Sequence, residues 1–269
     1  MRESARLTGP RIVSISNQKG GVGKTTTAIN LAAGLANLGQ KILIIDLDPQ
    51  GNASTGLGID ASRRKFTTYD LLLGSARPSE IFVATAIDGL DICPATQDLS
   101  SADIDLAEMD NRMHLLRAAL RQEDVRSRGY DWVLIDCPPS LSLLTLNAMV
   151  ASHSVLVPLQ SEFFALEGLS QLMLTIREIR QSANEALRIE GIVLTMFDGR
   201  NNLSQMVEQD AREALGDLVY DTIVPRAVRI SEAPSYAMSV LQYDPASKGS
   251  VAYRALAQEV VERRLKAAA

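Results

Sequence analysis

The sequence contains few cysteines and few aromatic residues, and each shortage excludes a class of protein. Among 269 residues there are 2 cysteines, Cys93 and Cys137, and aromatic side chains make up 4%. Two cysteines cannot form the disulfide framework of a small secreted domain, and they are typical of a reducing compartment. Few aromatics beside abundant Leu, Ile, Val and Ala favour helices packed on a parallel sheet over a β-sandwich.

The chain also lacks a basic excess and a long hydrophobic run. Its net charge of −5 excludes a global positive field for nucleic acid, although this leaves room for a local basic patch. No run approaches the roughly 18 apolar residues that a membrane span requires. The polar stretch from Met1 to Arg11 has no apolar segment typical of a secretory signal. We therefore expect a soluble, cytoplasmic protein.

Apolar runs alternate with helical patterns along the whole chain. Strands are predicted at residues 11–16, 41–46, 90–93, 132–136, 154–158, 189–196 and 222–224, and helices at 25–38, 113–126, 166–182, 203–215 and 250–266. This order predicts an α/β fold with one doubly wound, mostly parallel sheet covered by helices on both faces. The domain is expected to span residues 11–269 after a polar tail at 1–10. Residues 60–110 mix short apolar runs with Gly, Pro and Ser, and we expect surface excursions there.

The strongest motif lies between the first predicted strand and the first predicted helix. Residues 18–25 read Gln-Lys-Gly-Gly-Val-Gly-Lys-Thr, and a glycine-rich stretch in this position is typical of a phosphate-binding loop. Lys24 is predicted to reach the β- and γ-phosphates, and the Thr25 hydroxyl to bind Mg²⁺. Gln18 stands where the standard pattern has its first glycine, and a second lysine, Lys19, follows it. A glycine-rich turn with incidental lysines is the alternative.

Carboxylates end two of the predicted strands. Asp136 ends one, and Asp46 and Asp48 close another. Ligands of parallel sheets bind outside the carboxyl ends of the strands, so Asp136 is predicted to hold Mg²⁺. One of Asp46 and Asp48 is predicted to position an attacking water. A helix cap or a polar strand end is the alternative for these residues.

Together these motifs resemble the ParA/Soj chromosome-partitioning ATPases, whose phosphate loop is a deviant Walker A motif. The resemblance rests on KGGVGKT at 19–25, DLDPQGN at 46–52 and DCPP at 136–139, and it extends to 194–202, 223–234 and 243–249. It implies a P-loop NTPase that hydrolyses ATP with Mg²⁺ and closes into a homodimer around ATP. It also implies binding to double-stranded DNA without sequence preference, association with the nucleoid, and a ParB-type partner that stimulates hydrolysis.

The resemblance also implies roles for single residues. Lys19 would reach the phosphates of the partner subunit and, with Lys24, act in catalysis, because a cation there can neutralise charge developing on the γ-phosphate. Asp48 would position water and lie beside the metal, which Thr25 and Asp136 would hold. The nucleotide would contact Lys19, Gly20, Gly21, Val22, Gly23, Lys24, Thr25, Thr26, Met196, Pro225 and Arg226. DNA would contact Arg200 and Arg229, with Arg226 and Lys248 as further candidates; solvated surface charge is the alternative for each.

Three other classes of protein can carry such a loop. A membrane-cycling ATPase of the MinD type should end in an amphipathic helix with a bulky apolar face, whereas this chain has little bulk at 260–266 and then three alanines. A metal-cluster carrier requires cysteine ligands, and Cys93 and Cys137 are far apart in sequence. A small-molecule kinase requires an acceptor pocket, which nothing in the sequence marks.

Overall fold

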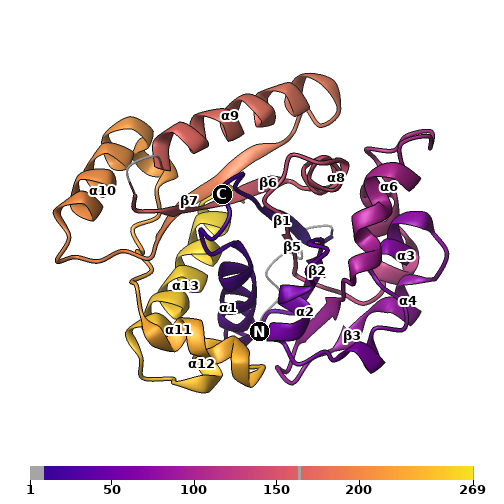
Figure 1. The fold of residues 1–269 in the computed structure, drawn as a ribbon, viewed down its shortest axis with the longest axis horizontal. Helices are drawn as coiled ribbons and strands as arrows, with labels where there is room; N and C mark the ends of the chain where they lie inside the picture. The colour runs from indigo at the N-terminus through magenta and orange to yellow at the C-terminus, as the bar shows by residue number, and fades with distance from the viewer. Residues whose placement is uncertain (1–8, 163–164, 269) are drawn as a thin grey trace.

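A sheet of seven strands forms the centre of the computed structural model, which describes residues 9–162 and 165–268 (Figure 1). Its strand order is β3-β4-β2-β5-β1-β6-β7. The strands are β1 (Arg11–Ile15), β2 (Ile42–Asp46), β3 (Val83–Ala84), β4 (Leu90–Cys93), β5 (Trp132–Asp136), β6 (Ser154–Gln160) and β7 (Arg188–Thr195). Neighbouring strands are parallel except β3, which pairs antiparallel with β4.

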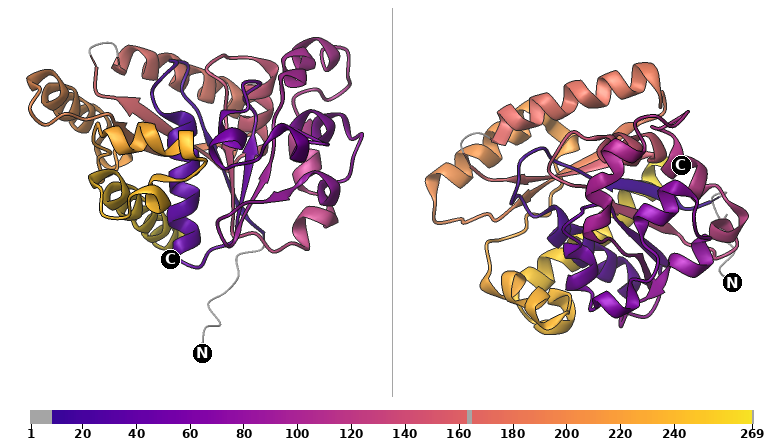
Figure 2. Two further views of the ribbon diagram at one scale, coloured as in Figure 1. Left: turned by 60° about the horizontal axis from the view of Figure 1, so that its bottom comes forward. Right: turned by 45° about the vertical axis from the view of Figure 1, so that its right-hand side comes forward.

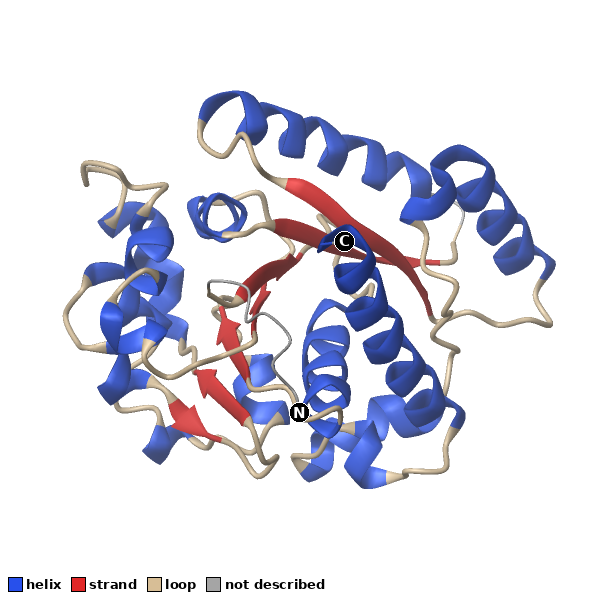
Figure 3. Ribbon diagram, turned by 180° about the vertical axis from the view of Figure 1, so that it is seen from behind, coloured by secondary structure: helices blue, strands red, loops and turns tan. Residues whose placement is uncertain are grey.

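Helices cover both faces of this sheet (Figures 1 and 3). They are α1 (Lys24–Asn37), α2 (Asn52–Gly56), α3 (Thr68–Leu73), α4 (Pro78–Ile81), α5 (Ala102–Asp105), α6 (Leu115–Leu120), α7 (Glu123–Arg126), α8 (Leu143–Ala151), α9 (Ala165–Ser182), α10 (Asn202–Leu215), α11 (Val228–Glu232), α12 (Val240–Tyr243) and α13 (Lys248–Ala268). α1, α12 and α13 pack in one apolar cluster with one face of the sheet. α3, α4, α6 and α8 pack in a second cluster, and α8, α9 and α10 in a third. Every residue of β2 and β5 is buried, as expected for parallel strands covered on both faces.

The predicted doubly wound sheet is confirmed, and six of the predicted strands appear within a few residues of the expected bounds. The strand predicted at 222–224 is wrong. Val224 N–H donates to the Leu194 carbonyl and Phe197 N–H donates to the Val224 carbonyl. Regular pairing does not develop, because Met196 adopts a left-handed φ of 52° between them and Pro225 has no N–H to donate.

Two other sequence predictions also need correction. The single helix predicted at 113–126 is divided into α6 and α7, and the α8 helix was not predicted. The segment 60–110 is not a set of surface excursions, because Leu71, Ile81, Leu99 and Leu106 are buried in the apolar cluster that covers one face of the sheet. The domain boundary at residue 11 stays a prediction, since residues 1–8 of the expected tail lie outside the described part of the chain. None of the helices within the described ranges is long and apolar enough to cross a membrane.

A tight helix contact lies between α1 and α13, which run side by side (Figures 2 and 3). A Cβ added at Gly34 of α1 would lie 2.8 Å from the Ala257 Cβ and 3.1 Å from the Tyr253 carbonyl oxygen of α13. The Tyr253 hydroxyl also lies 3.3 Å from the Thr27 hydroxyl, one turn into α1. The absence of a side chain at Gly34 therefore sets the position of α13 against the helix that begins at the phosphate loop.

We predict that Gly34→Ala destabilises the protein by about 1–3 kcal/mol, because a methyl group is forced against rigid backbone. Gly168→Ala in α9 is the matched control: no atom lies within 4 Å of its Cβ position. This control should stabilise by roughly 0.5–1 kcal/mol, since alanine favours the helix. Equilibrium denaturation of both variants measures the difference. Equal effects in the two variants would contradict the tight contact.

Candidate functional site

The predicted phosphate loop joins β1 to α1 and is held open by two left-handed glycines. Gly21 and Gly23 have φ values of 75° and 90°, which other residues rarely adopt. A Cβ at Gly20 or Gly21 would meet no protein atom within 4 Å. Open space therefore remains beside the loop backbone, as binding of a phosphate by N–H groups requires.

Two residues outside the motif fix this loop. Asn17 Nδ2 donates to the Pro158 carbonyl at 2.8 Å, and Asn17 Oδ1 accepts from Lys19 N–H at 3.0 Å. On the other side, the Thr195 hydroxyl at the end of β7 donates to the Val22 carbonyl at 2.8 Å. The loop is thus tied to β6 and β7 as well as to β1, and sequence spacing alone did not identify these supports.

The two lysines of the loop lie in different surroundings. Lys24 is 7% exposed, and its Nζ donates to the Lys19 carbonyl at 3.0 Å. Burial lowers the pKa of Lys24, and the negative charges of Asp136 and Asp48 oppose that effect. Lys19 Nζ instead forms an ion pair with Glu162 at 2.9 Å, in which both side chains are partly exposed. Exposed pairs are weak, so Lys19 is free to exchange Glu162 for another anion.

Asp46 and Asp48 have different roles in the structure. Asp46 is completely buried and accepts hydrogen bonds from Ser54 N–H at 2.8 Å and from the Ser54 hydroxyl at 2.6 Å. Burial raises its pKa to about 6, although the Ser54 hydrogen bonds act in the opposite direction. Asp48 is 9% exposed, and its Oδ1 accepts from Gln50 N–H at 3.0 Å. Asp46 is therefore committed to holding the chain, and Asp48 is the better candidate for positioning water.

Asp136 is the most unusual group of the site. It ends β5 directly opposite Asp46 of β2, and it is fully buried. Neither of its carboxylate oxygens has a hydrogen-bond partner among the described residues. Burial and the negative charge of Asp46 raise the pKa of Asp136 well above its usual range; the Thr25 hydroxyl lies near enough to lessen this rise, although it does not reach hydrogen-bonding geometry. A buried carboxylate without partners is costly, and a hard divalent cation would offset that cost. The residues present thus fit Mg²⁺, with Thr25 and Asp48 as the neighbouring oxygen donors.

A cleft of about 560 Å³ opens beside the start of α1. It brings together five residues predicted to contact the nucleotide: Gly23, Thr26, Met196, Pro225 and Arg226. Tyr253 of α13 and Ile230 of α11 also line it and were not predicted. The volume is in the range of small-molecule sites, and the cleft adjoins the phosphate loop through Gly23. The contact roles of these residues stay predictions.

The predicted DNA-contacting residues lie on the surface but are not equivalent. The Arg200 side chain is 92% exposed and pairs with Asp198 at 3.2 Å. Arg229 pairs with both Glu232 at 3.0 Å and Asp244 at 3.3 Å, so its charge is largely balanced. Arg226 is exposed and pairs with no carboxylate of the described residues, and Lys248 is exposed at the start of α13. Arg226 is therefore a stronger candidate than the sequence suggested.

Comparisons with known proteins agree with this geometry. A model of the AAA domain family matches residues 10–189. The chain is 55% identical to the chromosome partitioning protein ParA of Caulobacter vibrioides, over 94% of both chains. It is 47% identical to the sporulation initiation inhibitor protein Soj of Bacillus subtilis, over 93% of this chain and 98% of that one. A solved structure of cobyrinic acid a,c-diamide synthase from Mycobacterium smegmatis, with bound ADP and magnesium, is 35% identical with a TM-score of 0.82 over 97% of each chain.

We predict that Asp136→Asn changes the pH dependence of stability in a defined direction. The fold raises the pKa of Asp136. The contribution of this residue to the stability of the wild-type protein therefore falls as pH rises above the ordinary carboxyl pKa of about 4. The variant cannot ionise, so its melting temperature relative to wild type should increase between pH 4 and pH 8. Added Mg²⁺ and ATP should stabilise wild type much more than the variant. Thermal melts across this pH range test both effects, and parallel profiles would contradict the assignment.

Proposed function

Since this chain belongs to the ParA/Soj family of chromosome-partitioning ATPases and has the P-loop NTPase fold, we propose that it is an ATP-dependent switch that segregates chromosome or plasmid DNA. In this proposal the ATP-bound form is a homodimer that binds double-stranded DNA without sequence preference. Slow hydrolysis, stimulated by a ParB-type partner, resets it. The protein would act in the cytoplasm, associated with the nucleoid. The relatives named for chromosome partitioning support this reading, because their identity extends over nearly the whole chain.

The single observation that carries the ATPase proposal is the unpartnered Asp136 carboxylate beside the buried Lys24. The backbone from Gly20 to Gly23 would bind the phosphates, and the 560 Å³ cleft would hold the base. Asp136, Thr25 and Asp48 are the residues that would hold Mg²⁺. When bound, the metal would neutralise charge on the phosphate oxygens. Lys24, already desolvated, would bind the transferring phosphate strongly, because charge interactions strengthen where water is excluded.

Asp48 would position the attacking water rather than remove its proton. Its Oδ1 accepts a hydrogen bond from Gln50 N–H, so the orientation of the carboxylate is fixed. Asp46 would keep it there through the hydrogen bond from Asp48 N–H to Asp46 Oδ1 at 3.3 Å. The two carboxylates at this strand end would thus have different roles: Asp46 holds the backbone in place, and Asp48 would face the ligand.

Lys19 would make dimerisation depend on ATP. In the single chain it pairs with Glu162, and two copies brought face to face would place lysines of like charge near each other. Phosphates between the subunits would attract Lys19 away from Glu162 and remove that repulsion. The γ-phosphate then supplies the free-energy difference between monomer and dimer that a nucleotide switch requires.

The rival functions have less support from this chain. A membrane-cycling role would require an apolar face on the terminal helix, yet Leu256 and Val260 of α13 are buried against the core. Cys93 and Cys137 are both free and buried, away from any surface where a cluster could be delivered. The relative solved as cobyrinic acid a,c-diamide synthase is 35% identical, against 55% for the partitioning relative. No feature of the cleft marks an acceptor for phosphoryl transfer to a small molecule.

We predict that mutating the two lysines of the loop has different effects. Lys24→Ala should abolish ATP binding in a direct titration, because the only buried cation of the loop is lost. Lys19→Ala should bind ATP nearly as well as wild type and fail to dimerise with it. Sedimentation with ATP and Mg²⁺ measures the second effect, and Glu162→Gln is its control, since freeing Lys19 should leave dimerisation intact or improve it. A Lys19→Ala protein that dimerises normally would show that Lys19 acts within its own chain.

A second prediction concerns DNA. Replacing Arg200 with Glu should weaken binding to all duplex sequences about equally, since no helix among the described residues resembles a base-reading helix. In wild type, log affinity should fall with log salt by roughly 0.9 for each phosphate neutralised. Each arginine lost from a symmetric dimer removes two contacts, so the slope should become shallower by about two. Arg229→Glu should have a smaller effect, because Glu232 and Asp244 already balance its charge. Unchanged slopes in a salt titration would move the DNA surface elsewhere.

A further inference from the structure

A second cleft, of about 430 Å³, lies at the opposite end of the strands from the phosphate loop. It is formed where β1, β6 and β7 begin and where α13 ends. Its charged and polar side chains are Arg11, His153, Arg188, Glu190, Arg263 and Arg264. Four guanidinium groups and one carboxylate therefore line a single cleft in a protein whose net charge is −5.

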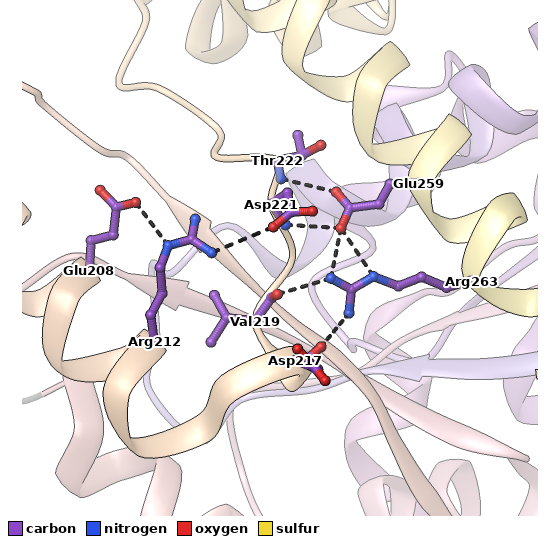
Figure 4. A network of polar contacts seen from close by, with 8 residues as sticks. All are labelled: Glu208, Arg212, Asp217, Val219, Asp221, Thr222, Glu259 and Arg263. Carbon is purple, nitrogen blue, oxygen red and sulfur yellow. Dashed lines mark hydrogen bonds and ion pairs between the residues drawn. The ribbon is translucent and has the colours of Figure 1, made fainter. Parts of the chain in front are cut away.

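Two of these arginines are balanced. Arg11 forms an ion pair with Glu190 at 2.5 Å. Arg263 pairs with Glu259 at 2.7 Å and donates to the carbonyls of Asp217 and Val219 (Figure 4). Its guanidinium group also lies over the Tyr220 ring at 4.3 Å. These contacts fix Arg263 between α13 and the chain that leads to the nucleotide cleft, so it forms a wall of the second cleft.

The other two arginines have no such balance. Arg188 and Arg264 form no ion pair with any residue in the described ranges. Arg264 is partly buried against the Trp132 ring at 4.7 Å, and its Nη1 donates to the Asp131 carbonyl at 3.1 Å. Arg11 adds a further unused donor, because its Nε is buried without a hydrogen-bond partner. Three neighbouring guanidinium groups thus keep donors for which the described chain provides no acceptor.

This arrangement is unfavourable in the absence of an anion. Burial lowers the pKa of Arg264 and the charge of Arg11 lowers it further, whereas the charges of Asp131 and Glu190 act in the opposite direction. Like charges in a partly dehydrated place repel, and the cost is recovered when an oppositely charged group enters with matching hydrogen bonds. A bound anion would offset both the burial of Arg264 and its repulsion by Arg11.

We propose that this cleft binds the phosphate group of a small molecule. The planar fork of arginine matches phosphate oxygens in two-point hydrogen bonds, and several guanidinium groups on different elements suit a tetrahedral group better than a flat carboxylate. The volume lies within the range of small-molecule sites. An extended polyanion such as DNA is disfavoured, because Glu190, Glu259 and Asp131 lie around the same arginines. The site is separate from the proposed ATP site and does not depend on it.

The two histidines of the chain make a direct test. His153 lines the cleft, whereas His114 directly precedes α6, which packs in a different apolar cluster from α13. Inorganic phosphate and glycerol 3-phosphate are titrated into the full-length protein, with ADP and Mg²⁺ saturating the phosphate loop and with sodium chloride matching the ionic strength. The ring resonances of His153 should shift saturably, and those of His114 should stay in place. Shifts of neither histidine, or of both alike, would overturn the proposal.

Arginine variants test which side chains of the cleft contribute to phosphate binding. Arg188→Gln, at an exposed position, should weaken phosphate binding measured by calorimetry about tenfold, as expected for one lost charged hydrogen bond. Arg264→Gln should do the same, and Arg264→Lys should recover only part of the loss because the fork is missing. Arg121→Gln, at an exposed arginine elsewhere, is the control and should have no effect. Unchanged affinity in Arg188→Gln and Arg264→Gln would overturn the assignment.

Two further arms separate this proposal from others. The Lys24→Ala protein should lose ATP binding and keep the response of His153 to phosphate, so failure of the ATPase proposal and failure of this one give different results. Duplex DNA and vesicles containing anionic phospholipid are tested with the same histidine readout. A response to either of these probes, with none to inorganic phosphate or glycerol 3-phosphate, would overturn the small-molecule assignment.

Discussion

The carboxylate of Asp136, buried at the end of β5 without a hydrogen bond to either oxygen, is the constraint on which the rest of the nucleotide site depends. Such a group is tolerated only where compensating charge is close. Lys24 lies close enough to interact with it and is itself desolvated. Each group reduces the cost of burying the other; Lys24 donates to the Lys19 carbonyl, whereas the Asp136 oxygens have no hydrogen-bond partner among the described residues. The site would therefore favour a cation beside Asp136 and an anion beside Lys24, and a metal-bound nucleotide would supply both.

The surrounding structure keeps this imbalance from collapsing. Ser54 of α2 satisfies Asp46, the other buried carboxylate at this edge. The loop cannot fold onto Asp136, because Thr195 and Asn17 hold its backbone from β7 and β6. Behind it, the contact of Gly34 with α13 fixes the first helix of the site. Stability elsewhere in the fold thus maintains a local arrangement that is unfavourable by itself, as is common at functional sites.

The position of the predicted phosphate loop was easier to read from the sequence than the walls of the cleft beside it. Residues 18–25 are contiguous, so their glycines and lysines could be placed between a strand and a helix from the chain alone. Tyr253 and Ile230 line the nucleotide cleft but lie more than 200 residues from the loop, and neither carries a pattern that indicates a ligand. The segment 60–110 was misjudged because α3, α4 and α5 are too short for a helical period to be visible. Met196 could not be foreseen as the residue whose φ of 52° ends the pairing of β7 with the segment before Pro225.

Charge is distributed in different ways at the two ends of the sheet, and this difference would suit the two ends to different kinds of anion. At the carboxyl ends of the strands, Lys24 faces Asp136 and Asp48, so an anion can enter favourably only with a cation. At the amino ends, Arg188 and Arg264 have no carboxylate within ion-pairing distance in the described chain, so an anion can enter alone. α13 reaches both places, with Tyr253 in one cleft and Arg264 in the other. α13 therefore joins the two clefts, and any coupling between ligands bound in them would act through this helix.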